Sequence, residues 1–206
     1  SGDLQIGHAQ NLSIEYDDMN DKIYLWTSNS SLLGATRIDA SDLSIKGNYN
    51  NIIPSGYTNA VSCISTNGKY FIMNAYNGTE NKIFVFSLLT ILNQAPSPKY
   101  QFFVNSGQNN SSSQLTKGIL CDNDNIYCLT GDDNTGNKKK LYAYTLNGDL
   151  IYKHKITAGQ DWSISRGNVW DANGLALYHP HPNIKALLVG VSSGGSISSN
   201  KRIYSI

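Results

Sequence analysis

The sequence predicts an all-β fold, and within that class a β-propeller with four detectable blade-like repeats. Three observations lead to this prediction: a composition that favours strands and turns, a strand–turn–strand pattern that recurs four times, and a spacing of about 50 residues between the repeats. The chain has 206 residues, which is enough for one domain with a substantial core.

The composition favours strands and excludes a nucleic-acid-binding protein. The chain is rich in Asn, Ser, Gly and Tyr and has only two glutamates, Glu15 and Glu80, whereas helices are usually filled with Glu, Lys, Ala and Leu. The net charge is +1 and only 15% of the residues are charged, so the chain lacks the basic face that binds phosphates. No apolar run approaches the ~20 residues that span a bilayer. The three cysteines are expected to be small buried side chains.

The repeat consists of a short apolar strand, a polar turn and a second apolar strand, followed by a loop and a third strand. Four segments carry the first part of this pattern: "QNLSIEYDDMNDKIYLWTS", "NAVSCISTNGKYFIMNAY", "KGILCDNDNIYCLTGD" and "NGLALYHPHPNIKALLVGVSS". The third strands are "GATRIDA", "KIFVFSL", "KLYAYTL" and "KRIYSI". The first strands align at positions that are 49, 58 and 56 residues apart.

The turns and the side-chain alternation agree with antiparallel strands. Asn67-Gly68 and Asn147-Gly148 predict type I′ hairpins, because this turn needs a positive φ at both central residues. Apolar and polar residues alternate along the strands, as in Ile23 and Leu25 against Tyr24 and Trp26, which is typical of sheets packed face to face.

A unit of about 50 residues with three or four antiparallel strands is typical of a propeller blade, with another β-sandwich or barrel as the alternative. We expect one domain over residues 1–206, with blades near 8–45, 57–93, 114–156 and 170–206. The segment 94–112 can supply further strand material. The number of blades, four or five, and closure of the ring by sequence outside this chain stay open.

Polar residues recur where the first strand of each blade begins. The residues that precede the four strand anchors are mostly small (Asn11, Ala60, Gly118 and Gly174), as crowding near a propeller axis requires, and amide or lysine side chains stand one step earlier. Amides and Lys bind hydroxyls or phosphates, and aromatic faces pack on sugars, so this rim is expected to bind a carbohydrate or a polyol phosphate. Simple hydration of a channel mouth is the alternative. The expected ligand-binding residues are His8, Gln10, Tyr57, Asn59, Lys117, Trp170, Asp171 and Asn173.

Catalytic and metal sites are less well supported. Glycoside hydrolysis needs two carboxylates at a defined separation, and nothing in the sequence brings Glu15 and Glu80 together. Asp171 is a better candidate than either glutamate for a catalytic acid, but the sequence shows no second carboxylate to act with it. His179 and His181 form an H-x-H pair without a third ligand. We therefore expect no catalytic residues, no metal and no cofactor, and a non-enzymatic protein is favoured.

The segments "GHAQNLSIEYDD…YLWT", "TKGILCDNDNIYCLTG" and "DANGLALYHP…ALLVGVSSG" together resemble the propeller domains of helveticin J-like class III bacteriocins. They are also similar to the receptor-binding domains of Gram-positive phage tails and to TagC-like teichoic-acid proteins. The resemblance covers residues 6–206 and rests on strand motifs, and known members are longer. The "GH-x-Q" motif at the start of the family's domain falls on Gly7, His8 and Gln10 of this sequence. Asp171 stands near the position where the resemblance implies an acidic residue.

The resemblance implies a β-propeller that recognises a Gram-positive cell-wall glycopolymer, either teichoic acid or a polysaccharide. The first expectation is a secreted, non-enzymatic bacteriocin-type binding protein. The alternatives are a phage tail receptor-binding adhesin and a hydrolase of wall glycans or glycopolymers. The expected location is extracellular or in a virion, with no nucleic-acid partner and no membrane span.

Overall fold

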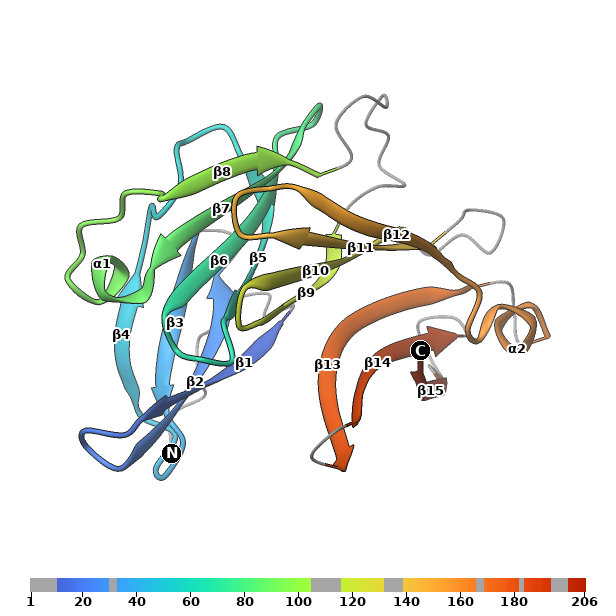
Figure 1. Ribbon diagram of the computed structural model, residues 1–206, viewed down its shortest axis with the longest axis horizontal. Helices are drawn as coiled ribbons and strands as arrows, with labels where there is room; N and C mark the ends of the chain where they lie inside the picture. The colour runs from blue at the N-terminus through green and yellow to red at the C-terminus, as the bar shows by residue number, and fades with distance from the viewer. Residues whose placement is uncertain are drawn as a thin grey trace.

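Four antiparallel sheets, arranged around a common axis, make up the fold (Figure 1). The computed structural model describes residues 11–29, 33–104, 116–131, 139–165, 169–181, 184–193 and 200–206, without the side chains of Asn59, Ile164 and Asn200. Each sheet is a meander in which strands adjacent in sequence pair, so the predicted all-β propeller with four detectable blades is confirmed. In the described part of the chain no helix is long and apolar enough to cross a membrane.

We call the sheets blades 1 to 4 in chain order. Blade 1 holds β1 (Leu12–Asp17), β2 (Lys22–Asn29), β3 (Gly34–Asp39) and β4 (Ile45–Tyr49). Blade 2 holds β5 (Thr58–Ile64), β6 (Tyr70–Tyr76), β7 (Asn81–Ser87) and β8 (Tyr100–Phe103). Blade 3 holds β9 (Thr116–Asp122), β10 (Asn125–Thr130), β11 (Lys139–Thr145) and β12 (Leu150–Ile156). Blade 4 holds β13 (Asp171–His181), β14 (Ile184–Ser193) and β15 (Asn200–Ser205).

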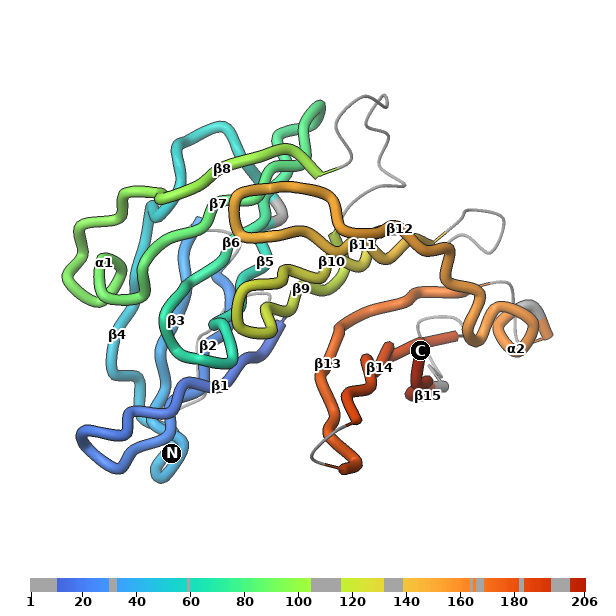
Figure 2. The backbone as a smooth tube through the Cα atoms, viewed as in Figure 1, coloured from blue at the N-terminus to red at the C-terminus, as the bar shows by residue number. Residues whose placement is uncertain are grey.

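Blades 1 and 2 extend beyond the predicted bounds, because each has a fourth strand that the repeat pattern did not include. In blade 2 this strand is β8, which lies in the segment expected to supply further strand material. Two helices of five residues were not predicted: α1 (Leu88–Leu92), between β7 and β8, and α2 (Gln160–Ile164), between blades 3 and 4 (Figure 2).

The two Asn-Gly turns differ from the predicted type I′. Gly68 and Gly148 have positive φ, but Asn67 and Asn147 do not. The amides of Gly68 and Gly148 donate to the carbonyls of Ser65 and Thr145, so each turn is a type I turn followed by a left-handed glycine. The prediction was wrong because Asn-Gly occurs in both kinds of hairpin turn, and only the sign of φ at the Asn distinguishes type I′ from type I followed by a left-handed glycine.

Three apolar cores fill the three spaces between neighbouring blades. Trp26 packs with Phe71 between blades 1 and 2, Cys63 packs with Cys121 between blades 2 and 3, and Leu141 packs with Trp170 between blades 3 and 4. All three cysteines are free and buried, as expected. The aromatic and β-branched residues of the repeat thus serve mainly to join one blade to the next.

The outer faces of blades 1 and 4 point away from these cores and carry exposed apolar side chains. Leu12 and Tyr16 on β1 are 63% and 62% exposed, and Ile203 on β15 is 74% exposed. Figure 1 shows the two blades diverging from the axis, with no further described sheet between them. The ring therefore has an apolar open side.

Candidate functional site

The innermost strands β1, β5, β9 and β13 meet at the axis, as the repeat pattern predicts. The Asn11 side-chain amide donates to the carbonyls of Ser62 (2.7 Å) and Ile119 (2.9 Å), so one side chain ties three blades together. A Cβ atom on Gly118 would lie 2.9 Å from the carbonyl carbon of Gly174. Small residues at these positions therefore allow β9 and β13 to approach closely, which confirms the expected crowding.

Part of the predicted ligand-binding set does come together, at the rim where the innermost strands begin. Lys117 Nζ lies 3.5 Å from Asp171 Oδ1, and Asn173 donates its side-chain amide to the other carboxylate oxygen of Asp171. The Lys117 and Asp171 side chains are 25% and 20% exposed. We call these three residues the rim cluster. It offers amide, ammonium and carboxylate groups to a hydroxylated ligand.

The remaining predicted residues are placed differently. Trp170 is fully buried, donates its ring N–H to the Ala158 carbonyl at 3.1 Å, and has Lys139 Nζ 4.5 Å from its ring centroid. Its ring therefore faces the core, where no sugar can stack on it. Tyr57 packs edge-to-face on Phe84 at 5.4 Å, in the core between blades 1 and 2.

Asn59 lies in β5, and its side chain is outside the described set. His8 and Gln10 lie outside the described residues altogether. For these three residues and for the rim cluster, the ligand-binding role therefore stays a prediction.

The central channel is lined mainly by apolar side chains. A cavity of about 290 Å³ lies between the innermost strands, lined among others by Ile14, Ile64, Ile119 and Leu177, with His179 and Thr66 as polar neighbours. Such a lining favours packing over the recognition of a polar polymer.

The carboxylates near the N-terminus have a structural role. Glu15 is buried and accepts hydrogen bonds from the Trp26 ring N–H (2.6 Å) and from Arg37 Nε (2.8 Å) and Nη2 (2.6 Å). Arg37 in turn lies over the Tyr24 ring, 3.4 Å from its centroid. Both oxygens of Glu15 are thus engaged in hydrogen bonds within blade 1. Among the residues described by the structure, no group of three or more His, Cys, Asp or Glu side chains is placed to hold a metal ion.

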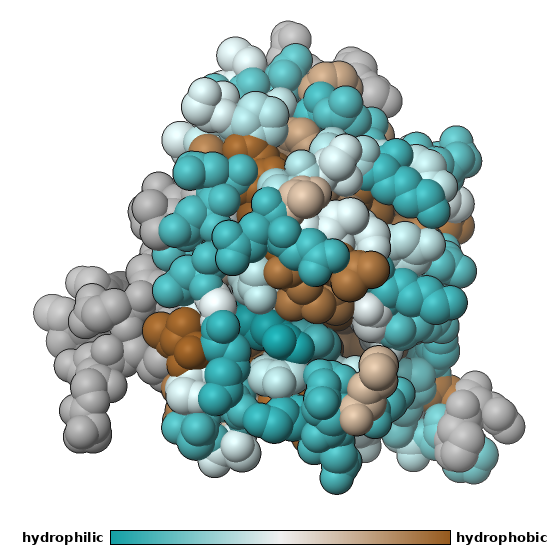
Figure 3. All heavy atoms as spheres, turned by 90° about the vertical axis from the view of Figure 1, so that its left-hand side faces the viewer, coloured by the Kyte–Doolittle hydropathy of each residue, from teal (hydrophilic) through white to brown (hydrophobic). Residues whose placement is uncertain are grey.

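The face formed by blade 1 and α1 is hollowed on both sides of the helix. Figure 3 shows apolar atoms gathered near the middle of this face, surrounded by hydrophilic side chains. A groove of about 620 Å³ runs between α1 and the β1–β2 hairpin, lined by Leu88, Leu89, Met19, Arg37 and Lys69 among others. We call it the hairpin groove.

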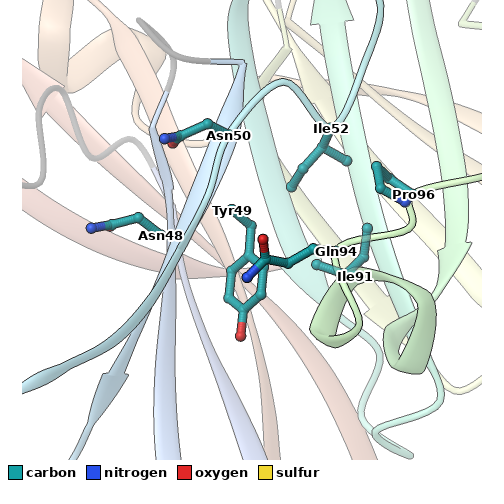
Figure 4. A pocket seen from close by; sticks show the side chains of 7 residues that line it. All are labelled: Asn48, Tyr49, Asn50, Ile52, Ile91, Gln94 and Pro96. Atoms are coloured by element: carbon teal, nitrogen blue, oxygen red, sulfur yellow. The ribbon is translucent and has the colours of Figure 1, made fainter.

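A smaller cleft of about 130 Å³ lies on the other side of α1 (Figure 4). It is lined by Asn48, Tyr49, Asn50, Ile52, Ile91, Gln94 and Pro96. We call it the Tyr49 cleft. The repeat alignment did not point to it, because its residues belong to an outer strand and a helix end rather than to the innermost strands.

Comparison with known proteins identifies the architecture. Residues 4–205 match the family described as "Phage 5-bladed beta propeller receptor binding platform domain". The tail fibre of Staphylococcus aureus phage P68 superimposes with a TM-score of 0.65 at 17% identity, over 95% of this chain and 39% of the fibre chain. Hydrazine synthase of Kuenenia stuttgartiensis superimposes with a TM-score of 0.50 at 13% identity, over 100% of this chain and 66% of that chain.

One curated protein with significant similarity is the putative major teichoic acid biosynthesis protein C of Bacillus subtilis (strain 168). It is 29% identical over 91 residues, which is 43% of this chain and 21% of that protein. The chain thus spans about a fifth of the length of this curated relative and well under half of the phage fibre.

Proposed function

Because the chain belongs to the family of phage five-bladed β-propeller receptor-binding platform domains, we propose that it is the part of a phage tail protein that binds a receptor on a Gram-positive host cell. The observation that carries this proposal is the family match over residues 4–205, together with four sheets that follow the propeller topology. The superposition with a staphylococcal phage tail fibre supports the propeller fold. The proposed location is the virion.

The proposed receptor is a cell-wall glycopolymer, either teichoic acid or a wall polysaccharide. The similarity to a Bacillus subtilis protein named for teichoic acid biosynthesis supports this choice, although it covers less than half of the chain. The rim cluster of Lys117, Asp171 and Asn173 is one proposed contact, because its ammonium and amide groups suit phosphates and hydroxyls.

The family match favours the phage adhesin over the bacteriocin as the role of this chain. The two roles differ in their effect on the target cell, since an adhesin binds without killing. A wall hydrolase, in turn, releases reducing ends or phosphate from the wall.

An experiment with intact Gram-positive cells separates the three roles. Fluorescently labelled protein should coat the cells, leave colony counts unchanged and release neither reducing ends nor phosphate. Killing in proportion to binding would indicate the bacteriocin. Release of wall products that is lost in Asp171→Asn would indicate the hydrolase. Absence of binding to any Gram-positive species tested would contradict the proposal.

A further inference from the structure

The Tyr49 cleft is a concave site between two blades. One wall is the end of the outer strand β4 and the loop that follows it, with Ile52. The other wall is the C-terminal end of α1, with Ile91, and the segment after the helix, with Gln94 and Pro96 (Figure 4). Ile52 and Ile91 are 6% and 1% exposed and belong to the core between blades 1 and 2, so the cleft has a rigid apolar floor. Its volume of about 130 Å³ suits a ligand of one ring rather than a longer chain.

Tyr49 provides an aromatic surface that is already fixed in place. Its ring stacks on Trp26 with centroids 5.1 Å apart and an angle of 23° between the planes. The hydrogen bond from Trp26 to Glu15, at 2.6 Å, holds Trp26 in turn. Burial raises the pKa of the Tyr49 hydroxyl, so this group stays protonated and can donate at neutral pH. A ligand packing on the ring would therefore meet a preorganised surface.

Gln94 occupies a backbone position where glycine is usually preferred. The Gln94 amide donates to the Ile91 carbonyl and the Ala95 amide donates to the Thr90 carbonyl, both at 2.9 Å, which is the Schellman pattern at the end of a helix. In this pattern the left-handed residue is Gln94, with φ of 53°. A glutamine there is strained relative to glycine. Figure 4 shows its side chain beside the Tyr49 ring, so the strained position places a carboxamide at the cleft.

The chemistry of the lining selects the class of ligand. None of the seven lining residues is charged, and they combine an aromatic ring, three carboxamides, edge-strand backbone and aliphatic side chains. Of the three carboxamides, that of Gln94 lies beside the Tyr49 ring, whereas Asn48 and Asn50 point away from it (Figure 4). A phosphate would need cations or convergent backbone N–H groups, whereas a pyranose offers hydroxyls to the carboxamide and an apolar face to the tyrosine. We propose that the Tyr49 cleft binds one neutral pyranose unit of the host-surface glycan. This inference rests on the proposed function and adds the sugar as the recognised group.

The test uses a substitution that should strengthen the fold while weakening binding. Gln94→Gly removes the carboxamide that lies beside the Tyr49 ring and also relieves the left-handed strain, so it should raise the melting temperature. We expect it to lower the affinity of the full chain for Gram-positive cell walls about fivefold, as for the loss of one or two neutral hydrogen bonds. The matched control is Leu43→Gly, because Leu43 also has a left-handed backbone, with φ of 58°, and lies exposed outside the cleft. This control should be stabilised and should bind walls as the unmodified chain does.

A titration followed by NMR identifies the recognised group directly. The probes are methyl β-N-acetylglucosaminide, methyl α-glucoside and glycerol 3-phosphate. At least one glycoside should shift the side-chain amide signals of Gln94, and glycerol 3-phosphate should leave them in place. No shift with either glycoside, a shift with the phosphate alone, or unchanged wall binding by Gln94→Gly would overturn the inference. If the unmodified chain binds walls and the cleft variant binds equally well, the cleft inference fails while the proposed function stands.

Discussion

Buried polar residues of this propeller hold the strands of a blade together, and Glu15 is the clearest case. Its sequence neighbourhood of carboxylates, a histidine and a tryptophan resembles catalytic machinery, yet its carboxylate is fully used by Trp26 and Arg37 inside blade 1. From the sequence, no partner carboxylate could be assigned to it. Its structural role could not be assigned either, because that role depends on Arg37, 22 residues away and two strands distant in the sheet.

Replacing Glu15 should therefore damage stability. Glu15→Ala leaves the half-buried Arg37 guanidinium and the Trp26 ring N–H without their acceptor, and we expect the free energy of unfolding to fall by about 3 to 5 kcal/mol. Urea denaturation measures this change. The control Asp18→Ala removes an exposed carboxylate of the adjacent hairpin and should change stability by about 0.5 kcal/mol or less. Equal stability of the two variants would contradict the structural role.

Asp39 gives a prediction of pH dependence. Hydrogen bonds from the Ser41 hydroxyl and amide, together with Lys22, lower the pKa of the Asp39 carboxyl well below its usual range. A lowered pKa in the folded state stabilises the fold above the unfolded pKa, near 4, and this stabilisation is lost as the pH falls below it. Asp39→Asn should therefore be less stable than the unmodified chain at pH 7, and the difference should shrink towards pH 2. Urea denaturation across this range tests it, and a difference independent of pH would argue against it.

At the scale of elements, the innermost strands could be predicted well and the outer parts of the blades less so. Alternation and spacing identified β1, β5, β9 and β13, because each must bury one face and pass a crowded axis. The aromatic residues were harder to place. A tryptophan is a common sugar-binding residue, but whether the Trp170 ring points to the core or to the solvent depends on how blades 3 and 4 pack against each other. Tyr49 and Gln94 were missed, because they are brought together by an unpredicted helix and an outer strand that share no repeat position.

The close approach of β9 and β13 makes a direct prediction for Gly118. A Cβ atom at this position would lie 2.9 Å from backbone atoms of blade 4, and backbone cannot yield as a flexible side chain can. Gly118→Ala should therefore lower the free energy of unfolding by about 1 to 3 kcal/mol, as overpacking typically does. The neighbouring change Lys117→Ala breaks only a partly exposed ion pair and should cost about 1 kcal/mol or less. Thermal or urea denaturation of both variants tests the strand contact, and a Gly118→Ala variant as stable as the unmodified chain would refute it.

For the whole molecule, the family is five-bladed while the described residues form four sheets. The exposed apolar residues on the outer faces of blades 1 and 4 border the side of the ring where another blade would pack. Exposed apolar side chains gathered on such faces are typical of an interface. The arrangement explains why the sequence repeat left the blade count open: four units are present, and the open faces of blades 1 and 4 carry apolar residues such as Leu12 and Ile203.

The open side should be detectable with an apolar dye. The 206-residue chain should bind anilinonaphthalene sulfonate in its folded state, and the double substitution Ile14→Thr and Ile203→Thr should reduce the bound fluorescence by about half. Thr keeps the strand propensity of Ile, so the free energy of unfolding should change by only about 1 kcal/mol. Ile14 and Ile203 are 46% and 74% exposed, on blades 1 and 4, and Ile14 also lines the cavity between the innermost strands where this cavity meets the open side. Unchanged fluorescence in the double variant would show that the dye binds elsewhere.

The central claim is that this propeller binds a wall glycopolymer of a Gram-positive host. Co-sedimentation of the purified protein with isolated walls, before and after chemical removal of the glycopolymer, tests it most directly. The protein should sediment with intact walls, remain in solution with stripped peptidoglycan, and be released from intact walls by added soluble glycopolymer. Equal sedimentation with intact and stripped walls, or no sedimentation with either, would contradict the claim.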